Sequence, residues 1–146
     1  EAIKHICKDP KFIEVHRLSG FPGRSLDIGV VLDLMIHDID IILGLIDSPI
    51  KRVEAVGINV LTKYEDIANV RLTFKNGCVA NLTASRISDE SMRKIRIFLP
   101  HTYISLDYKN EEADIYRKDG EKITKEAIWI KKEEPLKKGF WDKLTG

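Results

Sequence analysis

The chain has 146 residues, 43% of them hydrophobic and 32% charged, which fits one domain of ordinary size that can bury a core. Its 24 lysines and arginines nearly balance its 23 aspartates and glutamates. That balance excludes the strongly basic surface that is typical of proteins binding nucleic acids or anionic membranes.

The first third of the chain predicts a strand, a loop and a helix. Residues 12–18 (FIEVHRL) alternate as a strand does, and the glycines and proline of residues 19–25 then predict a loop. Residues 30–46 are Val, Leu, Ile and Met on nearly every side, which predicts a helix buried within the domain and ended by Ser48-Pro49. Acidic residues and a histidine interrupt this run. Each aspartate would cost roughly 2.5–3.5 kcal/mol at a bilayer centre, which argues against a membrane span.

From Lys51 onward the hydrophobic period changes to two, which predicts a series of strands. Asn76-Gly77 supplies the positive φ angles of a type I′ hairpin turn, so the strands on either side should be antiparallel neighbours with one apolar and one polar face. The remainder is less regular and predicts a short amphipathic helix beyond residue 131. We expect strands at 53–61, 66–74, 78–87, 93–99, 102–108 and 113–117, with a further candidate at 127–131.

These elements predict an α+β fold in which helices pack on one face of a large, mostly antiparallel open sheet. The polar face of that sheet either faces solvent or meets another subunit. The two cysteines, Cys7 and Cys78, form neither a CxxC pair nor a disulfide framework, so we expect reduced thiols in a cytoplasmic protein.

The helix carries the residues of greatest chemical interest. Asp33, His37 and Asp40 are spaced by four and three residues, which places them on one helical face, whereas Asp38 lies off that face and is expected to be a surface or loop-capping residue. A titratable cluster among apolar neighbours is typical of acid–base chemistry, but structural ion-pair networks produce the same pattern. In that second interpretation the three residues pair with arginines such as Arg17, Arg24 or Arg86.

Other common chemistries have no signature in the sequence. Neither a GxGxxG nor a GxxxxGK[ST] motif occurs, so we expect this chain alone to bind no nucleotide cofactor. Asp33, His37 and Asp40 do not fit an HExxH zinc site, and no metal is expected. No serine lies in a GxSxG turn, which leaves nucleophilic acyl transfer without support.

Four segments, in the same order, resemble the C-terminal domain of the Gfo/Idh/MocA family of NAD(P)-dependent oxidoreductases: DIGVVLDLMIHDIDIILGL, KRVEAVGINV, EDIANVRLTFKNGCVANLTASR and RKIRIFLPHTYISLD. The family's helix carries an Asp and, four residues on, a His in a D-x-G/M-x-H-D-x-D pattern, which residues 33–40 resemble. An ED-x-A strand, an NG hairpin and an S-R strand end follow, here at Glu65-Asp66, Asn76-Gly77 and Ser85-Arg86.

The resemblance implies a single substrate-binding and oligomerisation domain over residues 1–146, similar to the C-terminal domain of dihydrodipicolinate reductase. The family's Rossmann dinucleotide-binding domain, with the lysine of its E-K-P motif, is absent from this chain. The full-length enzyme would use NAD or NADP to oxidise or reduce a carbinol of a sugar or nucleotide sugar, and it would form a homo-oligomer through its open sheet face. Alone, the chain is expected to be inactive.

The resemblance also implies roles for particular residues. His37 would be the acid–base residue, Asp33 would bind substrate or orient the imidazole, and Asp40 would be a further substrate contact. Arg17 and Arg24 resemble basic residues of nucleotide-sugar-linked members and could meet a diphosphate, although either could instead pair with a nearby carboxylate. A different hypothesis also stands: a non-catalytic module that binds a small ligand or assembles through its sheet.

Overall fold

The computed structural model describes residues 7–24 and 26–129. The helix predicted beyond residue 131 lies outside these residues. Within them, a one-turn π-helix (η1, Val31–Met35) runs directly into α2 (Ile36–Leu45). No described helix is long and apolar enough to cross a membrane. The strands are β1 (Phe12–Leu18), β2 (Ile50–Ile58), β3 (Ile67–Phe74), β4 (Val79–Ser85), β5 (Met92–Leu99), β6 (Thr102–Asp107), β7 (Glu112–Asp119) and β8 (Lys122–Trp129).

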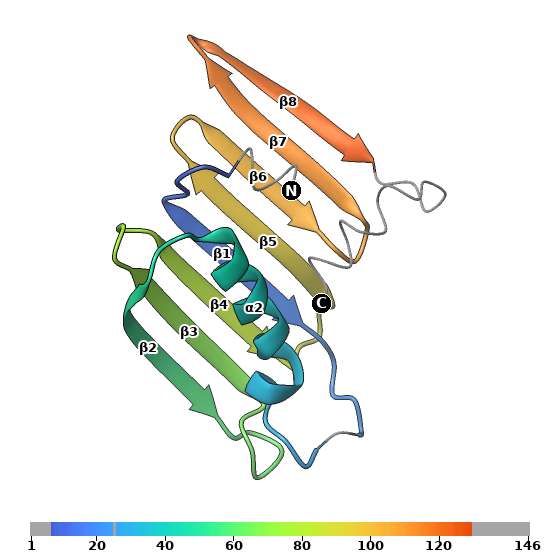
Figure 1. Ribbon diagram of the computed structural model, residues 1–146. Coiled ribbons are helices and arrows are strands. Elements are labelled where there is room, and N and C mark those ends of the chain that lie inside the picture. Colours follow the sequence, from blue (N-terminus) through green and yellow to red (C-terminus); the bar gives the residue numbers. More distant parts are fainter. Residues whose placement is uncertain (1–6, 25, 130–146) are drawn as a thin grey trace.

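All eight strands form one open sheet in the order β2-β3-β4-β1-β5-β6-β7-β8 (Figure 1). The first strand is inserted at the centre, where it runs parallel to β4 and antiparallel to β5. Every other neighbouring pair is antiparallel. The predicted fold class is therefore confirmed, and β1 joins the β2–β4 meander to the β5–β8 meander.

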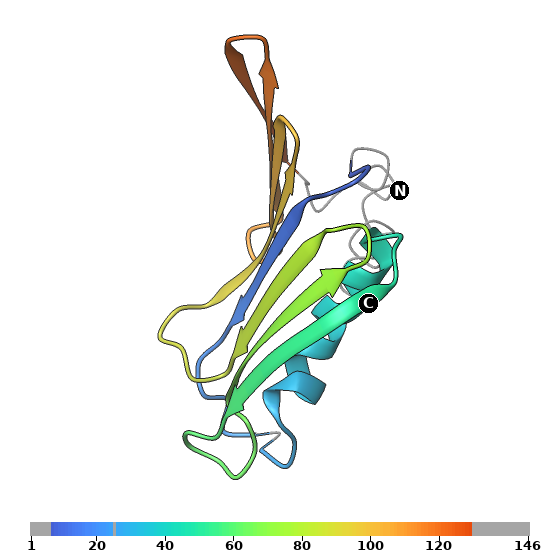
Figure 2. The same cartoon turned by 90° about the vertical axis from the view of Figure 1, so that its left-hand side faces the viewer.

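The helical segment covers one face of the sheet at the β1–β4 end, and the opposite face carries no described helix (Figure 2). Side chains on the helix face form the core, and the strand periodicity that sequence analysis identified fixes which side chains these are. In the β3–β4 hairpin the predicted apolar face is the buried one. The same buried face continues across the sheet through Ile13, Val15, Ile95, Ile97, Ile104, Leu106, Ala113 and Ile115.

Two local predictions are wrong. Within the β3–β4 turn only Gly77 has a positive φ, of 91°, and its N–H donates to the carbonyl of Phe74. This is a type I turn followed by a left-handed glycine, rather than a type I′ turn. The last strand begins at Lys122, five residues before the predicted start, because the tight turn at Gly120 folds β8 back along the whole of β7.

Candidate functional site

Only one side of the helical segment formed by η1 and α2, which carries Asp33 and His37, is buried. Met35, Asp38 and Ile42 face the sheet and are almost fully enclosed. On the outer side, three large apolar side chains remain exposed, so the prediction of a helix buried on all sides is wrong for this chain. They are Leu32, Ile36 and Leu43, with exposed fractions of 64%, 46% and 47%.

Asp33, His37 and Asp40 lie on the outward part of the same helix. Asp33 is half-buried, whereas His37 and Asp40 are exposed. Within the described part of the chain, none of these three side chains makes a hydrogen bond or an ion pair. The interpretation that they belong to an arginine network therefore has no support in residues 7–24 and 26–129, and their polar atoms are available to a ligand.

Arg17 is used in a different way from the one predicted. Its Nε and Nη2 donate to the two carboxylate oxygens of Asp38, each over 2.9 Å, in a buried bidentate ion pair. The expectation that Asp38 lies at the surface is wrong, since only 2% of the residue is exposed. The pair fixes the middle of the helix to β1, because burying either charge alone would be costly.

Arg24 lies apart from this pair. It is exposed in the loop that precedes the helix, next to Ser25, which falls outside the described residues. Arg17 is thus buried against Asp38 while Arg24 is exposed, and the described residues show no shared contact between the two arginines.

The start of the helix is held by Glu65. The Glu65 carboxylate accepts a hydrogen bond from the backbone N–H of Val31, and the backbone carbonyl of Glu65 accepts one from the N–H of Val30. A carboxylate at a helix N-terminus satisfies unpaired N–H groups and complements the helix dipole. Gly29 makes this approach feasible, because a Cβ at that position would overlap the Glu65 carboxylate.

Asp66 and Arg86 form a second buried ion pair, which lies beside the helix start. Asp66 accepts hydrogen bonds from the backbone N–H groups of residues 60–62, at 2.7–3.0 Å, and from Arg86 Nε at 2.9 Å. Burial alone would raise the pKa of Asp66, but the three N–H donors and the guanidinium outweigh it and hold that pKa well below its usual range. Arg86 also donates to the carbonyl of Ile28 at 2.7 Å, so this pair anchors the loop that leads into the helix.

Glu65, Asp66 and Arg86 are positioning residues. Sequence reasoning gave Glu65 and Asp66 no role, and it offered Arg86 only as a partner for Asp33, His37 and Asp40, which the structure does not show among the described residues. The ED-x-A and S-R motifs mark these residues in the sequence, but the motifs indicate a family resemblance and not a structural role. Alternation predicts which strand residues face the core, but it does not predict that the carboxylate just before β3 pairs with the guanidinium just after β4.

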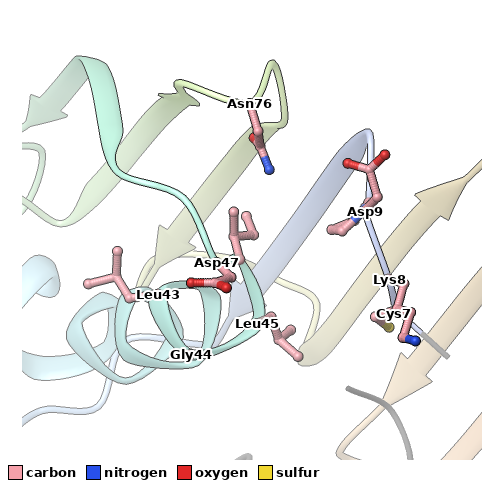
Figure 3. Close-up of a pocket in the computed structure, with 10 residues that line it drawn as sticks. Cys7, Lys8, Asp9, Leu43, Gly44, Leu45, Asp47 and Asn76 are labelled. Atoms are coloured by element: carbon pink, nitrogen blue, oxygen red, sulfur yellow. The ribbon is translucent and has the colours of Figure 1, made fainter. Parts of the chain in front are cut away.

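A cavity of about 740 Å³ lies at the other end of the helix (Figure 3). It is lined by the segment before β1, including Cys7 and Asp9, by the last turn of α2 and by Asp47 and Asn76. None of the residues selected from the sequence lines it. Its location therefore does not coincide with Asp33 and His37, and the uncommitted acid–base groups make the helix face the stronger candidate site.

Comparison with known proteins gives a consistent result. The model of the GFO/IDH/MocA C-terminal domain matches residues 13–104. UDP-N-acetylglucosamine 3-dehydrogenase from Acidithiobacillus ferrooxidans is 44% identical over 109 residues, which are 75% of this chain and 35% of that protein.

Solved structures show the same fold. A structure of the same Acidithiobacillus ferrooxidans dehydrogenase superimposes with a TM-score of 0.82 and 38% identity over 98% of this chain and 48% of that one. Levoglucosan dehydrogenase in complex with NADH gives a TM-score of 0.77 at 15% identity, covering 96% of this chain and 45% of that one. A super-repressor mutant of Gal80p from Saccharomyces cerevisiae gives 0.73 at 16%, covering 88% and 41%. The chain thus spans less than half the length of these relatives, and the last two show the fold alone.

Proposed function

The chain belongs to the GFO/IDH/MocA family, and on that premise we propose that it is the substrate-binding and catalytic-helix domain of an oxidoreductase acting on a carbinol of a sugar or nucleotide sugar. The observation that carries the proposal is the outward face of the helix. Asp33 and His37 lie one turn apart there, and no described residue uses their side chains. The name of the 44% identical relative supports a nucleotide sugar as the substrate class.

The chemistry of the proposal follows from the two side chains. A carbinol carbon can lose a hydride only as its hydroxyl proton is removed, and an imidazole is suited to accept that proton near neutral pH. We assign this step to His37. Asp33 accepts a hydrogen bond from the substrate or from the imidazole, and either contact favours the reacting geometry. Asp40, exposed one turn later, is placed to contact a further hydroxyl group.

The described residues do not fit a dinucleotide, because they include no G-x-G-x-x-G turn leading from a strand into a helix. We therefore assign the nicotinamide of NAD or NADP to a separate Rossmann domain and expect this chain to be inactive alone. Exposed Leu32, Ile36 and Leu43 beside the candidate residues support this arrangement, since they offer an apolar surface for such a domain to cover. The two described cysteines are free and buried, which supports a cytoplasmic location.

The open face of the sheet is proposed to bind a second copy of the chain. Phe12, Phe98, Tyr103 and Tyr116 form a continuous row across four strands, with ring centroids 4.9–5.7 Å apart, and Lys125 covers the last ring. Opposite charges also pair across strands on this face, as Arg96 does with Glu14. A face with aromatic residues and balanced charges is suited to self-association. Sedimentation velocity tests this: Phe98→Lys should shift the chain towards monomer, whereas Val53→Lys, on the opposite face, should not.

The test of catalysis joins this chain to a Rossmann domain of the same family and measures nucleotide-sugar oxidation by NADH or NADPH fluorescence. His37→Asn should lower kcat by at least roughly 100-fold with little change in KM, because general acid–base groups contribute about 10²–10⁴-fold. Asp40→Asn serves as the matched control and should change mainly KM. The Gal80p likeness shows that one fold can also serve a repressor, so unchanged turnover in His37→Asn would favour the non-catalytic module instead.

A further inference from the structure

A second arginine stands next to the buried Arg17–Asp38 pair. Arg93 on β5 is the direct partner of Arg17 in the β1–β5 register, so the two residues share the helix face of the sheet. Such partners have Cα atoms about 4.5–5.5 Å apart. The cluster formed by Arg17, Asp38 and Arg93 therefore lies beneath the helical turn that carries His37.

The charges of this cluster do not balance. Arg17 engages both carboxylate oxygens of Asp38. The Nε of Arg93 is enclosed and donates to no acceptor among the described residues. Burial lowers the pKa of Arg93, Arg17 lowers it further, and Asp38 acts in the opposite direction. Burial also raises the pKa of the neighbouring Tyr108, so that phenol stays neutral and supplies no negative charge. Among residues 7–24 and 26–129, one positive charge of this cluster therefore has no negative partner.

An enclosed guanidinium donor without an acceptor is costly and calls for an explanation, and an ion bound to the same guanidinium is one that the charges of this cluster favour. Two guanidinium groups on adjacent strands with a single carboxylate between them form a site that lacks one anion. A guanidinium group binds phosphate oxygens in a planar, bidentate manner. A phosphate group could therefore supply the negative charge that this site lacks. Arg93 is half-buried, so the outer atoms of its side chain can be reached from solvent.

We propose that Arg93 is an anion-binding residue that takes the diphosphate of a nucleotide sugar. Arg17 then has a supporting role, because it holds Asp38 and adds positive charge behind the ligand. Asp38 directly follows His37 in the chain, a step of about 100° around the helix, so a ligand held at Arg93 lies beside the turn that bears His37. The choice of a nucleotide sugar rests on the proposed function, whereas the anion site itself rests only on the charge cluster.

The test uses the ¹⁵N-labelled chain and follows the arginine Nε–Hε resonances by NMR during titration with inorganic pyrophosphate, UDP and N-acetylglucosamine. Pyrophosphate and UDP should shift the Arg93 resonance, and the uncharged sugar should not. Arg93→Gln should weaken pyrophosphate binding by roughly 10- to 100-fold, the range expected for hydrogen bonds to a charged group. Arg71→Gln, which removes an exposed arginine from the open sheet face, is the matched control and should bind as the parent does.

Several outcomes would overturn the inference. Arg93→Gln could bind pyrophosphate as tightly as the parent, or Arg71→Gln could lose as much affinity, which would indicate nonspecific charge attraction. Loss of the response once a Rossmann domain is joined would show that Arg93 instead pairs with a carboxylate of that domain. Arg93→Lys keeps the charge and guards against misfolding, and it should bind with intermediate affinity.

The inference and the proposed function can fail separately. If pyrophosphate binds at Arg93 while His37→Asn keeps full turnover, the anion site stands and the catalytic assignment is wrong. If His37→Asn is inactive while Arg93 does not respond to pyrophosphate or UDP, catalysis stands and the anion site is wrong.

Discussion

Replacing Asp38 should destabilise the chain more than replacing its partner Arg17, although the two residues form one ion pair. Asp38→Asn leaves two guanidinium groups, those of Arg17 and Arg93, side by side without a carboxylate. Arg17→Gln leaves the Asp38 carboxylate with Arg93 still nearby, so the remaining charges cancel. Breaking the Arg17–Asp38 pair should therefore cost more stability when Asp38 is replaced than when Arg17 is replaced.

The magnitudes follow from burial. The Arg17 and Asp38 side chains are only 8% and 2% exposed, and removing one partner of such a pair costs about 3–5 kcal/mol when the other charge is left uncompensated. We expect that full cost for Asp38→Asn. For Arg17→Gln we expect about 1.5–3 kcal/mol, the cost of losing charge-assisted hydrogen bonds. At roughly 2–4 °C per kcal/mol for a chain of this size, Asp38→Asn should lower Tm by about 10 °C.

Urea unfolding monitored by circular dichroism measures these differences, provided that the m-value is unchanged between variants. Adding Arg93→Gln to Asp38→Asn should recover part of the lost stability, because it removes one of the two uncompensated charges. Two results would contradict this reasoning: Arg17→Gln more destabilising than Asp38→Asn, or no recovery in the double variant. Either would show that Arg93 does not interact with the charge of Asp38.

Gly29→Ala should destabilise the chain by about 1–2 kcal/mol in urea unfolding, since its Cβ displaces the carboxylate that caps the helix; Gly44→Ala, whose Cβ meets nothing within 4 Å, should stabilise it by about 0.5–1 kcal/mol. Because the pKa of Asp66 is lowered in the fold, its stabilising effect is present above its unfolded pKa and lost as pH falls below about 4; unfolding measured against pH should therefore lose part of its acid sensitivity in Asp66→Asn. Burial raises the pKa of Cys7 and of Cys78 to about 11, so mass spectrometry should detect iodoacetamide adducts at pH 8 only after urea is added.

Alternation allowed most of the sheet to be predicted from the sequence. Seven of the strands, β1 to β7, coincide with predicted segments to within about three residues. Six of them bury residues on one face, and a period of two records that burial directly, whereas β2 is exposed along its whole length. The central position of β1 has no such local signal. Its parallel pairing with β4 joins residues far apart in the chain, and no turn residue marks it.

The site was predictable only in part, for reasons that differ between residues. Spacing placed Asp33, His37 and Asp40 on one helical face, and no residue that the structure describes binds any of the three side chains. Spacing also placed Asp38 on a different side of the helix, but it could not show that this side faces the sheet. Which side of a helix meets the sheet depends on tertiary packing, and here an aspartate faces inward because Arg17 on β1 supplies the opposite charge.

The sequence predicted a helix buried on all sides because its outer side is apolar as well. Side chains are adapted to their surroundings in the assembled protein, whereas the exposed fractions are those of a single chain. Leu32, Ile36 and Leu43 would be unfavourable at a permanently wet surface, and they flank the side chains to which catalysis is assigned. If a Rossmann domain covers this side, water is excluded around His37 and Asp33, which strengthens the electrostatic interactions there. The same apolar residues would then serve domain docking and catalysis together. Leu32→Ser should weaken both in the joined protein, whereas Val53→Ser, at a comparably exposed position on β2, should weaken neither.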